Sequence, residues 1–404
     1  MEQLSVYSEL YKNELLDSIV PFWLKNSPDR VNGGYFTCLD AQGNVYDTDK
    51  FVWLQGRQIW CFSMLYNKVE KKQEWLDMAL LGADFLEKYG RDQNGQFYFS
   101  LTKEGLPLVQ PYNIFSDCFA VMAFSELYKI TGLQKHKDIA IQTFSAINAR
   151  KNNWKGQFEK TISGTRPMKN FALPMILVNL SYEMEHLLGD DFITSTVPSL
   201  LNELLEEFYQ PEFGLILENI SPDGKFVDSF EGRLLNPGHA IEAMWFVMDI
   251  GKRLGNQELI EKATKIMLDT LIYGWDKKYG GIFYFMDVKG QPLQQLEADQ
   301  KLWWVHVEAL VALAKGYAYT GNTACLNAFN QVHDYTWKHF RDVENGEWFG
   351  YLNREGKVLQ QMKGGKWKGC FHIPRALFQI WQTFSSITNE TQNIASLEIN
   401  ANIK

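Results

Sequence analysis

The sequence predicts an all-α fold, an (α/α)6 barrel with short β-hairpins in the long loops of one rim. Three observations predict this fold: helical periodicity in roughly twelve segments, a glycine and aromatic motif that recurs between them, and connections that alternate between short and long. Antiparallel helix pairs with such alternating connections place every long loop at the same end of the molecule. Six pairs that close on themselves form the barrel, whereas an open solenoid would have the same local pattern.

The helical segments have apolar residues at the spacing of one helix face. Within a pair the links are short, such as Lys71-Lys72 or Gly321-Asn322, and we place the helix that follows each long connection on the inside of the barrel. The expected helices span residues 2–26, 51–69, 72–90, 113–131, 133–150, 168–188, 190–208, 237–254, 256–274, 301–319, 322–341 and 367–387.

The long connections carry the recurring motif, at a spacing of roughly 60 residues, as a repeat architecture requires. In most copies, aromatic or branched residues run into a polar glycine turn such as Asp40-Ala41-Gln42-Gly43, which predicts a short hairpin. The copies are Gly33-Gly34-Tyr35-Phe36, Gly95-Gln96-Phe97-Tyr98-Phe99, Gly156-Gln157-Phe158, Gly214-Leu215-Ile216-Leu217, Gly280-Gly281-Ile282-Phe283-Tyr284-Phe285 and Gly346-Glu347-Trp348-Phe349-Gly350-Tyr351.

The composition is that of one large globular domain. No linker rich in Pro, Gly or Ser divides the chain, so we expect a single barrel over residues 1–385 and a polar C-terminal tail over 386–404. A hydrophobic fraction of 46% with 22% charged residues can bury a sizeable core. The 13 Trp and 18 Tyr offer flat apolar faces with a polar edge, which suits a sugar.

The charge favours a small-molecule partner. A net charge of -8 argues against nucleic acid or an anionic membrane, because both select a basic surface. The N-terminus lacks the features of a signal peptide, and no apolar run reaches membrane-spanning length. The 5 cysteines form no CxxC pair and suit free thiols in a reducing compartment, so we expect a soluble cytoplasmic protein.

Two histidines stand out, because His239 and His372 each follow a glycine closely and lie within two residues of a proline. Proline favours the first helical position, so both imidazoles are expected at or just before the opening turn of a helix. The early turns of the other helices that follow hairpins should point to the same rim. They carry Arg57, Ser116, Asp117, Asn179, Glu242, Trp303, Trp304, Glu308 and Arg375.

Two imidazoles on opposite faces of one carbon could invert it, because each gains or loses a proton readily near neutral pH. One would remove the proton beside a carbonyl and the other would deliver a proton from the far side. Arg57 and Arg375 would stabilise the enediolate between these steps, and Glu308 would orient a histidine or relay a hydroxyl proton. A helical histidine that only packs or caps is the structural alternative, which we favour for His306.

Other chemistries fit the sequence less well. A metal site from His239, Glu242, Glu308 and His372 lacks HExxH or tight ligand spacing, so no metal is expected. A thiol nucleophile at Cys370 has no further support. A glycosidase needs two carboxylates across a cleft rather than two histidines.

Four separated motifs resemble the N-acylglucosamine 2-epimerase family, also called renin-binding proteins. They are Phe51-Val52-Trp53-Leu54-Gln55-Gly56-Arg57-Gln58, Asn236-Pro237-Gly238-His239, Lys301-Leu302-Trp303-Trp304 and Gly369-Cys370-Phe371-His372-Ile373-Pro374-Arg375. The resemblance covers nearly the whole chain except the tail from about Ser386. It implies an (α/α)6 barrel, usually a homodimer, that interconverts N-acetylglucosamine and N-acetylmannosamine.

The resemblance also implies residue roles. His239 and His372 would be the acid/base pair, supported by Arg57, Glu308 and Arg375. Asn179, Glu242 and Trp304 would line the sugar site, and the rim argument adds Ser116 as a substrate-binding residue.

No cofactor is expected for the chemistry, but family members are commonly activated by ATP without consuming it. Segment 156–164, with Gly156, Lys160 and Gly164, resembles the proposed nucleotide loop. That segment lacks the GKS or GKT of a Walker A loop, and its own residues predict one more hairpin. Two alternatives to the expected activity stay open: a cellobiose 2-epimerase or aldose-ketose isomerase on the same barrel, and a binding protein that has lost catalysis.

Overall fold

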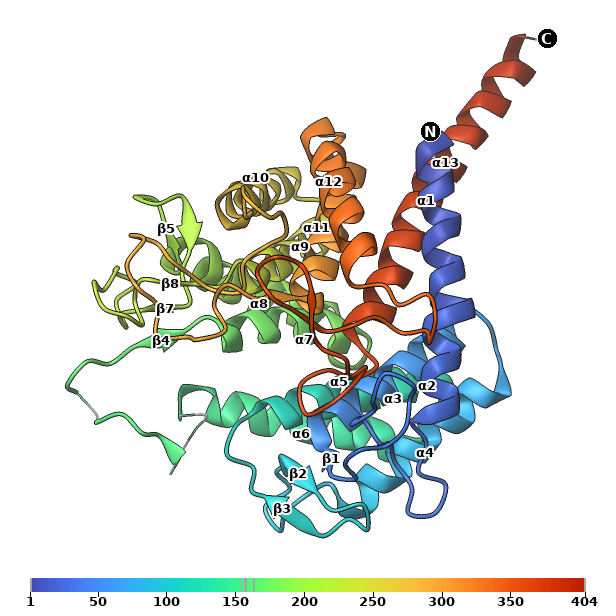
Figure 1. The fold of residues 1–404 in the computed structure, drawn as a ribbon, viewed down its shortest axis with the longest axis vertical. Helices are drawn as coiled ribbons and strands as arrows, with labels where there is room; N and C mark the ends of the chain where they lie inside the picture. The colour runs from blue at the N-terminus through green and yellow to red at the C-terminus, as the bar shows by residue number, and fades with distance from the viewer. Residues whose placement is uncertain (1, 154, 156–157, 163, 403–404) are drawn as a thin grey trace.

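The computed structural model describes residues 2–153, 155, 158–162 and 164–402, and its backbone is mainly helical (Figure 1). The long N-terminal helix contains a π-helical segment, Glu14–Ile19, between α1 and α2. A second π-helical segment, Glu203–Glu207, extends α8. The α-helices are α1 (Glu2–Asn13), α2 (Val20–Asn26), α3 (Val52–Lys68), α4 (Gln73–Tyr89), α5 (Phe115–Thr131), α6 (Gln134–Arg150), α7 (Ala172–Leu188), α8 (Asp190–Asn202), α9 (Pro237–Leu254), α10 (Gln257–Gly274), α11 (Trp303–Thr320), α12 (Thr323–His339) and α13 (His372–Asn402).

Helices α3, α5, α7, α9, α11 and α13 form an inner ring in which each packs against the next. Helices α4, α6, α8, α10 and α12 each pack outside the inner helix that precedes them, and α1 packs against α13, so the first and last helices lie side by side (Figure 1). The circle of inner helices closes between α3 and α13. There, the aromatic ring centroids of Trp60 on α3 and Phe371, just before α13, lie 5.5 Å apart. The predicted (α/α)6 barrel, with the helices that follow hairpins inside, is therefore confirmed.

Burial explains which helices lie inside. An inner helix contacts neighbours on several sides, so α11 is buried at every position from Trp303 to Gly316. An outer helix packs against the barrel with one face, so it needs a single apolar stripe. On α4 the stripe consists of Trp75, Met78, Ala79, Gly82, Ala83, Phe85 and Leu86.

The loops at the N-terminal ends of the inner helices hold short antiparallel strands, as predicted. Five copies of the motif take part in such pairings, through Pro28↔Tyr35, Arg91↔Phe97, Tyr209↔Ile216, Trp275↔Ile282 and Arg341↔Trp348. In the remaining copy, Gly156 and Gln157 lie outside the described residues. Two sheets have three strands, in the orders β1 (Lys50–Phe51), β2 (Ser100–Leu101), β3 (Pro107–Val109) and β10 (Lys301–Leu302), β11 (Tyr351–Leu352), β12 (Val358–Gln360). The two-stranded sheets pair β4 (Lys169–Asn170) with β7 (Asn219–Ile220), β5 (Tyr209–Gln210) with β6 (Leu215–Ile216), and β8 (Leu234–Leu235) with β9 (Met286–Asp287).

Three buried ion pairs fix this rim to the barrel. In each, an aspartate that follows α2, α10 or α12 binds a fully buried lysine in the segment that leads to an inner helix. The N–O distances are 2.8 Å for Lys50–Asp29, 3.2 Å for Lys301–Asp276 and 2.7 Å for Lys363–Asp342. A buried ammonium group is costly unless it is paired and hydrogen-bonded, so these contacts specify the loop positions over the inner helix N-termini.

The polar segment from Ser386 continues α13 in helical form to Asn402 and extends beyond the other helices (Figure 1). All twelve predicted helical segments are present, and most boundaries agree within a few residues. Among the described helices, none combines the length and apolar character needed to cross a membrane.

Candidate active site

A cavity of about 620 Å³ opens at the N-terminal ends of the inner helices. This volume lies in the range of small-molecule sites. Each inner helix contributes to its wall. The lining residues are Trp53 and Arg57 on α3; Phe115, Ser116 and Phe119 on α5; Ala172, Met175 and Ile176 on α7; His239 and Glu242 on α9; Trp303 and Trp304 on α11; and His372 and Arg375 on α13.

His239 lies in the first turn of α9. Asn236 is the N-cap, and its side chain accepts a hydrogen bond from the His239 backbone N–H at 3.2 Å, while Pro237 occupies the position where a missing N–H has no cost. The imidazole Nδ1 lies 2.9 Å from Oε1 of Glu218. Because a carboxylate only accepts, Nδ1 carries the hydrogen and Nε2 is left for proton transfer.

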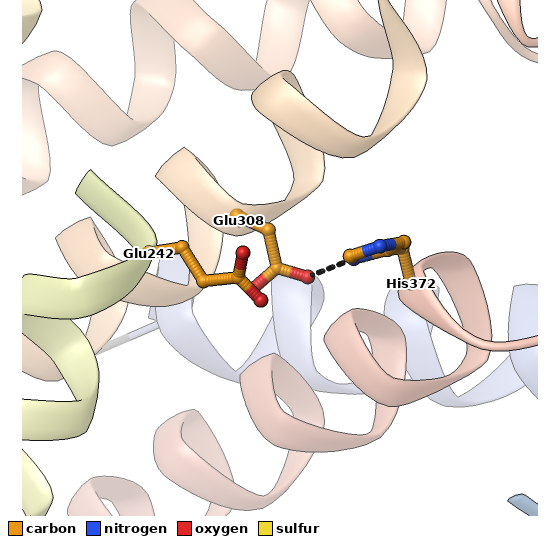
Figure 2. A group of neighbouring side chains, drawn as sticks. All are labelled: Glu242, Glu308 and His372. Carbon is orange, nitrogen blue, oxygen red and sulfur yellow. Dashed lines mark hydrogen bonds and ion pairs between the residues drawn. The ribbon is translucent and has the colours of Figure 1, made fainter. Parts of the chain in front are cut away.

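His372 is the first residue of α13, and Pro374 fits in the opening turn. Its Nδ1 donates to Oε1 of Glu308 at 2.8 Å, so it has the same tautomer as His239. Figure 2 shows Glu308 between His372 and Glu242. The expectation that Glu308 orients a histidine therefore matches the geometry.

Glu308 is held by two further donors. Trp245 Nε1 donates to its Oε2 at 2.9 Å, and Arg375 donates to its Oε1 at 2.7 Å. Arg375 also forms a short ion pair with Glu242. The carboxylate behind His372 is thus fixed on both oxygens.

The two imidazoles differ in their charged neighbours. Burial lowers the pKa of His372 well below its usual 6.5, and the charges of Arg57 and Arg375 lower it further against the opposing effect of Glu242. For His239, desolvation also disfavours the charged ring, but the charge and hydrogen bond of Glu218 outweigh it and raise the pKa. The two pKa values are therefore shifted in opposite directions, downward for His372 and upward for His239.

Trp304 joins the two histidines to one site. Its ring centroid lies 5.2 Å from that of His239 and 5.8 Å from that of His372. A Cβ on residue 238 would come within 2.7 Å of the Trp304 ring, so Gly238 permits this close approach.

Arg57 is buried in an aromatic cage. Its guanidinium carbon lies 4.3 Å from the ring centre of Trp53, 4.0 Å from that of Phe119 and 4.7 Å from that of Phe371. Burial lowers its pKa to about 9, which leaves it charged near neutral pH. Among the described residues no partner accepts from its Nε, so this cation is available to a negatively charged group in the cavity.

The remaining predicted residues divide into two groups. Ser116 and Trp303 line the cavity, and within the described part of the chain the buried Ser116 hydroxyl has no hydrogen-bond partner. Asn179 does not line the cavity but lies buried beneath it, 4.0 Å from the sulfur of Met122. Asp117 forms an ion pair with Arg150 at 2.8 Å instead of facing the site.

The expected nucleotide loop is separate from this cavity. Lys160 and Gly164 are exposed and do not line it, whereas Gly156 lies outside the described residues. His306 is structural, as expected. Its Nδ1 donates to the Leu302 carbonyl at 2.7 Å and its Nε2 accepts from the Ile282 N–H at 2.9 Å.

Sequence reasoning missed Glu218, which partners His239. It directly follows the fourth copy of the repeated motif, Gly214-Leu215-Ile216-Leu217, and the only signal was a carboxylate next to that motif. The cavity-lining Tyr284 and Tyr351 belong to the fifth and sixth copies, and Trp367 lies before the last inner helix. None of these residues lies on the helix faces from which the site was inferred.

Glu242, Glu308 and His372 place one ligand atom each within 4.8 Å of one another, as a metal site requires. Arg375 donates to both carboxylates, so its guanidinium already supplies positive charge there. A metal ion would have to compete with that cation.

Sequence comparison places the chain in a known family. A sequence model of the N-acylglucosamine 2-epimerase family matches residues 34–376. The chain belongs to this family. It is 39% identical to the N-acylglucosamine 2-epimerase of Mus musculus and 40% identical to that of Rattus norvegicus, in each case over 96% of the chain and 94% of the relative.

The fold comparison agrees as well. The structure of cellobiose 2-epimerase from Bacillus thermoamylovorans aligns with a TM-score of 0.81 at 22% identity, covering 94% of this chain and 99% of that one. The resemblance inferred from the four sequence motifs is confirmed.

Proposed function

We propose that the protein is an N-acyl-D-glucosamine 2-epimerase that interconverts N-acetylglucosamine and N-acetylmannosamine. The observation that carries the proposal is the pair of histidines, each with a carboxylate on Nδ1, in one cavity against one tryptophan. Membership of the family and the names of the relatives at 39% and 40% identity support the choice of substrate.

The reaction is a proton exchange at C2. In the open-chain sugar the C2–H is acidic because C1 is a carbonyl. Nε2 of the neutral His372 takes this proton, and the electron pair moves into an enolate across C1 and C2, with the negative charge on the C1 oxygen. Nε2 of the protonated His239 then returns a proton to C2 from the opposite face, which inverts the centre. In the reverse direction the two rings exchange roles.

The negative charge of the enolate has nearby partners. Arg57 faces the cavity as a buried cation without a carboxylate partner among the described residues, and it stabilises the oxygen that becomes negative. Glu308 stabilises His372 once that ring is protonated, and Glu218 does the same for His239. Trp304 offers a flat apolar face to the sugar carbons.

The experiment is to incubate the purified protein with N-acetylmannosamine in deuterated water and follow the sugars by NMR. The proposal predicts N-acetylglucosamine with deuterium at C2. Mannose is incubated in parallel, because C2 of an N-acylated sugar carries nitrogen and cannot become the carbonyl of a ketose. A ketose formed from mannose would indicate an aldose-ketose isomerase. Conversion of cellobiose in preference to the amino sugar would indicate a cellobiose 2-epimerase. Binding without turnover of any aldose would indicate a binding protein.

Three further properties belong to this proposal: a cytoplasmic location, a homodimer, and activation by ATP that is not consumed. The resemblance of the four motifs to the family supports the dimer, and the resemblance of segment 156–164 supports ATP. Turnover measured with and without ATP, together with a Lys160→Ala variant, tests activation, and light scattering tests the dimer. No cofactor is required for the proton transfers, because both proton carriers are side chains.

A further inference from the structure

The wall of the cavity is uneven in polarity. The inner helices α3, α5, α9 and α13 each place a charged or hydroxyl side chain on it, and α11 places two indoles. Helix α7 contributes only Ala172, Met175 and Ile176, which have no polar side-chain atom. Phe119 of the neighbouring helix α5 also lines the cavity, with the guanidinium of Arg57 over its ring. A sugar hydroxyl against this stretch would lose its hydration without gaining a partner.

One polar group borders this apolar wall. Ser116 of α5 is 1% exposed, lines the cavity, and has a hydroxyl that bonds no other described residue. Buried hydroxyls normally have a partner, so a ligand that brings one to this position would be favoured. Helices α5 and α7 therefore present apolar surface to the cavity together with one unused hydroxyl, and the guanidinium of Arg57 on α3 lies over the Phe119 ring at its edge.

The position of the wall relative to the histidines limits which part of a sugar can meet it. During inversion, the C2 proton leaves toward one imidazole and returns from the other, so the other three substituents of C2, which are C1, C3 and the nitrogen, lie in the plane between the rings. The ring of Trp304 on α11 lies against both imidazoles. In the ring of inner helices, α5 and α7 lie across from α11 and α13.

We propose that Ala172, Met175, Ile176 and Phe119 form the acyl subsite, with the methyl group of the 2-acetamido substituent on Met175 and the amide beside Ser116. This inference rests on the proposed function and names the residues that distinguish an N-acylated sugar from one with a free 2-hydroxyl. The acetamido group matches the wall, since it has an apolar end and one amide able to bond the Ser116 hydroxyl.

The kinetic test uses mannosamines with N-acetyl, N-propanoyl and N-butanoyl groups. Met175→Ala removes side-chain volume from the subsite, so the ratio of kcat/KM for the N-butanoyl to the N-acetyl sugar should rise about 10-fold, the gain from burying two added methylenes. Met184→Ala is the matched control, because Met184 is also buried on α7 but does not line the cavity. Equal ratios in the two variants would overturn the proposal.

A second measurement uses the wild-type protein and does not depend on whether an alanine variant folds. The protein is labelled with ¹³C at the methionine methyl groups, and the Met175 signal is assigned by its loss in Met175→Leu. With N-acetylglucosamine at saturation, a nuclear Overhauser effect between the acetyl methyl and the Met175 methyl is expected, and its absence would overturn the subsite. If the wild type bound the sugar with this effect but converted no N-acylated sugar, the proposed function would fail while the subsite held.

Discussion

Nδ1 of His239 and Oε1 of Glu218 lie 2.9 Å apart, which joins a helix residue to a loop residue that lies 21 positions earlier in the chain. His372 and Glu308 form the equivalent contact at 2.8 Å. The charged surroundings differ, because the charges of Arg57 and Arg375 lower the pKa of His372 beyond the effect of burial, whereas the charge of Glu218 raises the pKa of His239. The two pKa values thus shift in opposite directions, as the proposed pairing of a base with an acid requires.

The pH dependence of turnover should reflect that asymmetry. In the direction in which His372 is the base, the proposed mechanism requires His372 neutral and His239 protonated. The value of kcat/KM in that direction should therefore rise through the lowered pKa of His372 and fall through the raised pKa of His239. Glu218→Gln removes the charge that raises the His239 pKa, so the alkaline limb should move to lower pH. Glu212→Gln, a change at an exposed position of the same loop region, is the control. An unmoved alkaline limb in Glu218→Gln would contradict the assignment.

Replacing one histidine should separate deprotonation from inversion. In His239→Asn, His372 can still remove and return the C2 proton on its own face, so one epimer should exchange its C2–H with deuterated water without converting to the other. His372→Asn should exchange only the opposite epimer. NMR of each sugar, incubated separately, measures both rates. Exchange of the same epimer in both variants would place the two rings on one face of the substrate.

Glu308→Gln should lower kcat by about 10²–10⁴-fold. The neutral amide neither stabilises the protonated form of His372 nor neutralises the positive charge of Arg375. KM should change little, since Glu308 lies behind His372 and not on the cavity wall. Glu126→Gln is a matched control, a buried carboxylate that pairs with Lys129 near the other end of the barrel. Steady-state kinetics and thermal unfolding of both variants would show whether the effect is catalytic or only a loss of stability.

The loop ion pairs should matter for folding. Burial raises the pKa of Asp276, but hydrogen bonds from Arg354 and the Lys278 backbone and the charge of Lys301 outweigh it and lower the pKa to about 2. A lowered carboxyl pKa contributes stability above about pH 4, and this contribution is lost as the pH falls toward 2.

Asp276→Asn should therefore cost about 2–3 kcal/mol near neutral pH and less near pH 3. Urea unfolding at both pH values measures the difference. Asp269→Asn, which breaks the exposed pair with Lys265, should have little effect at either pH. An equal cost for Asp276→Asn at both pH values would mean that the charge of Asp276 is not the source of the stability.

Much of the fold was predictable because its signals are local. Helical periodicity and glycine turns gave the helices, and the rule that long loops share a rim brought His239, His372, Glu308 and Arg57 together before any contact was known. Asn179 was placed on the rim by the same rule, but it lies below the cavity because residues one turn earlier, Met175 and Ile176, reach the wall first.

The rest of the site was not predictable from periodicity. Glu218, Trp367 and Tyr284 lie outside the helices, in loops whose course depends on tertiary contacts such as the buried lysine pairs. The partnership of Glu308 with His372 joins α11 to α13, and no pattern within one helix reveals which carboxylate faces which ring.

Helix α13 both packs against α1 and carries His372 and Arg375. Under the proposed mechanism, a barrel in which α13 had not docked would lack one proton carrier and the arginine that holds Glu242 and Glu308. The appearance of activity during refolding would then report the docking of this one helix.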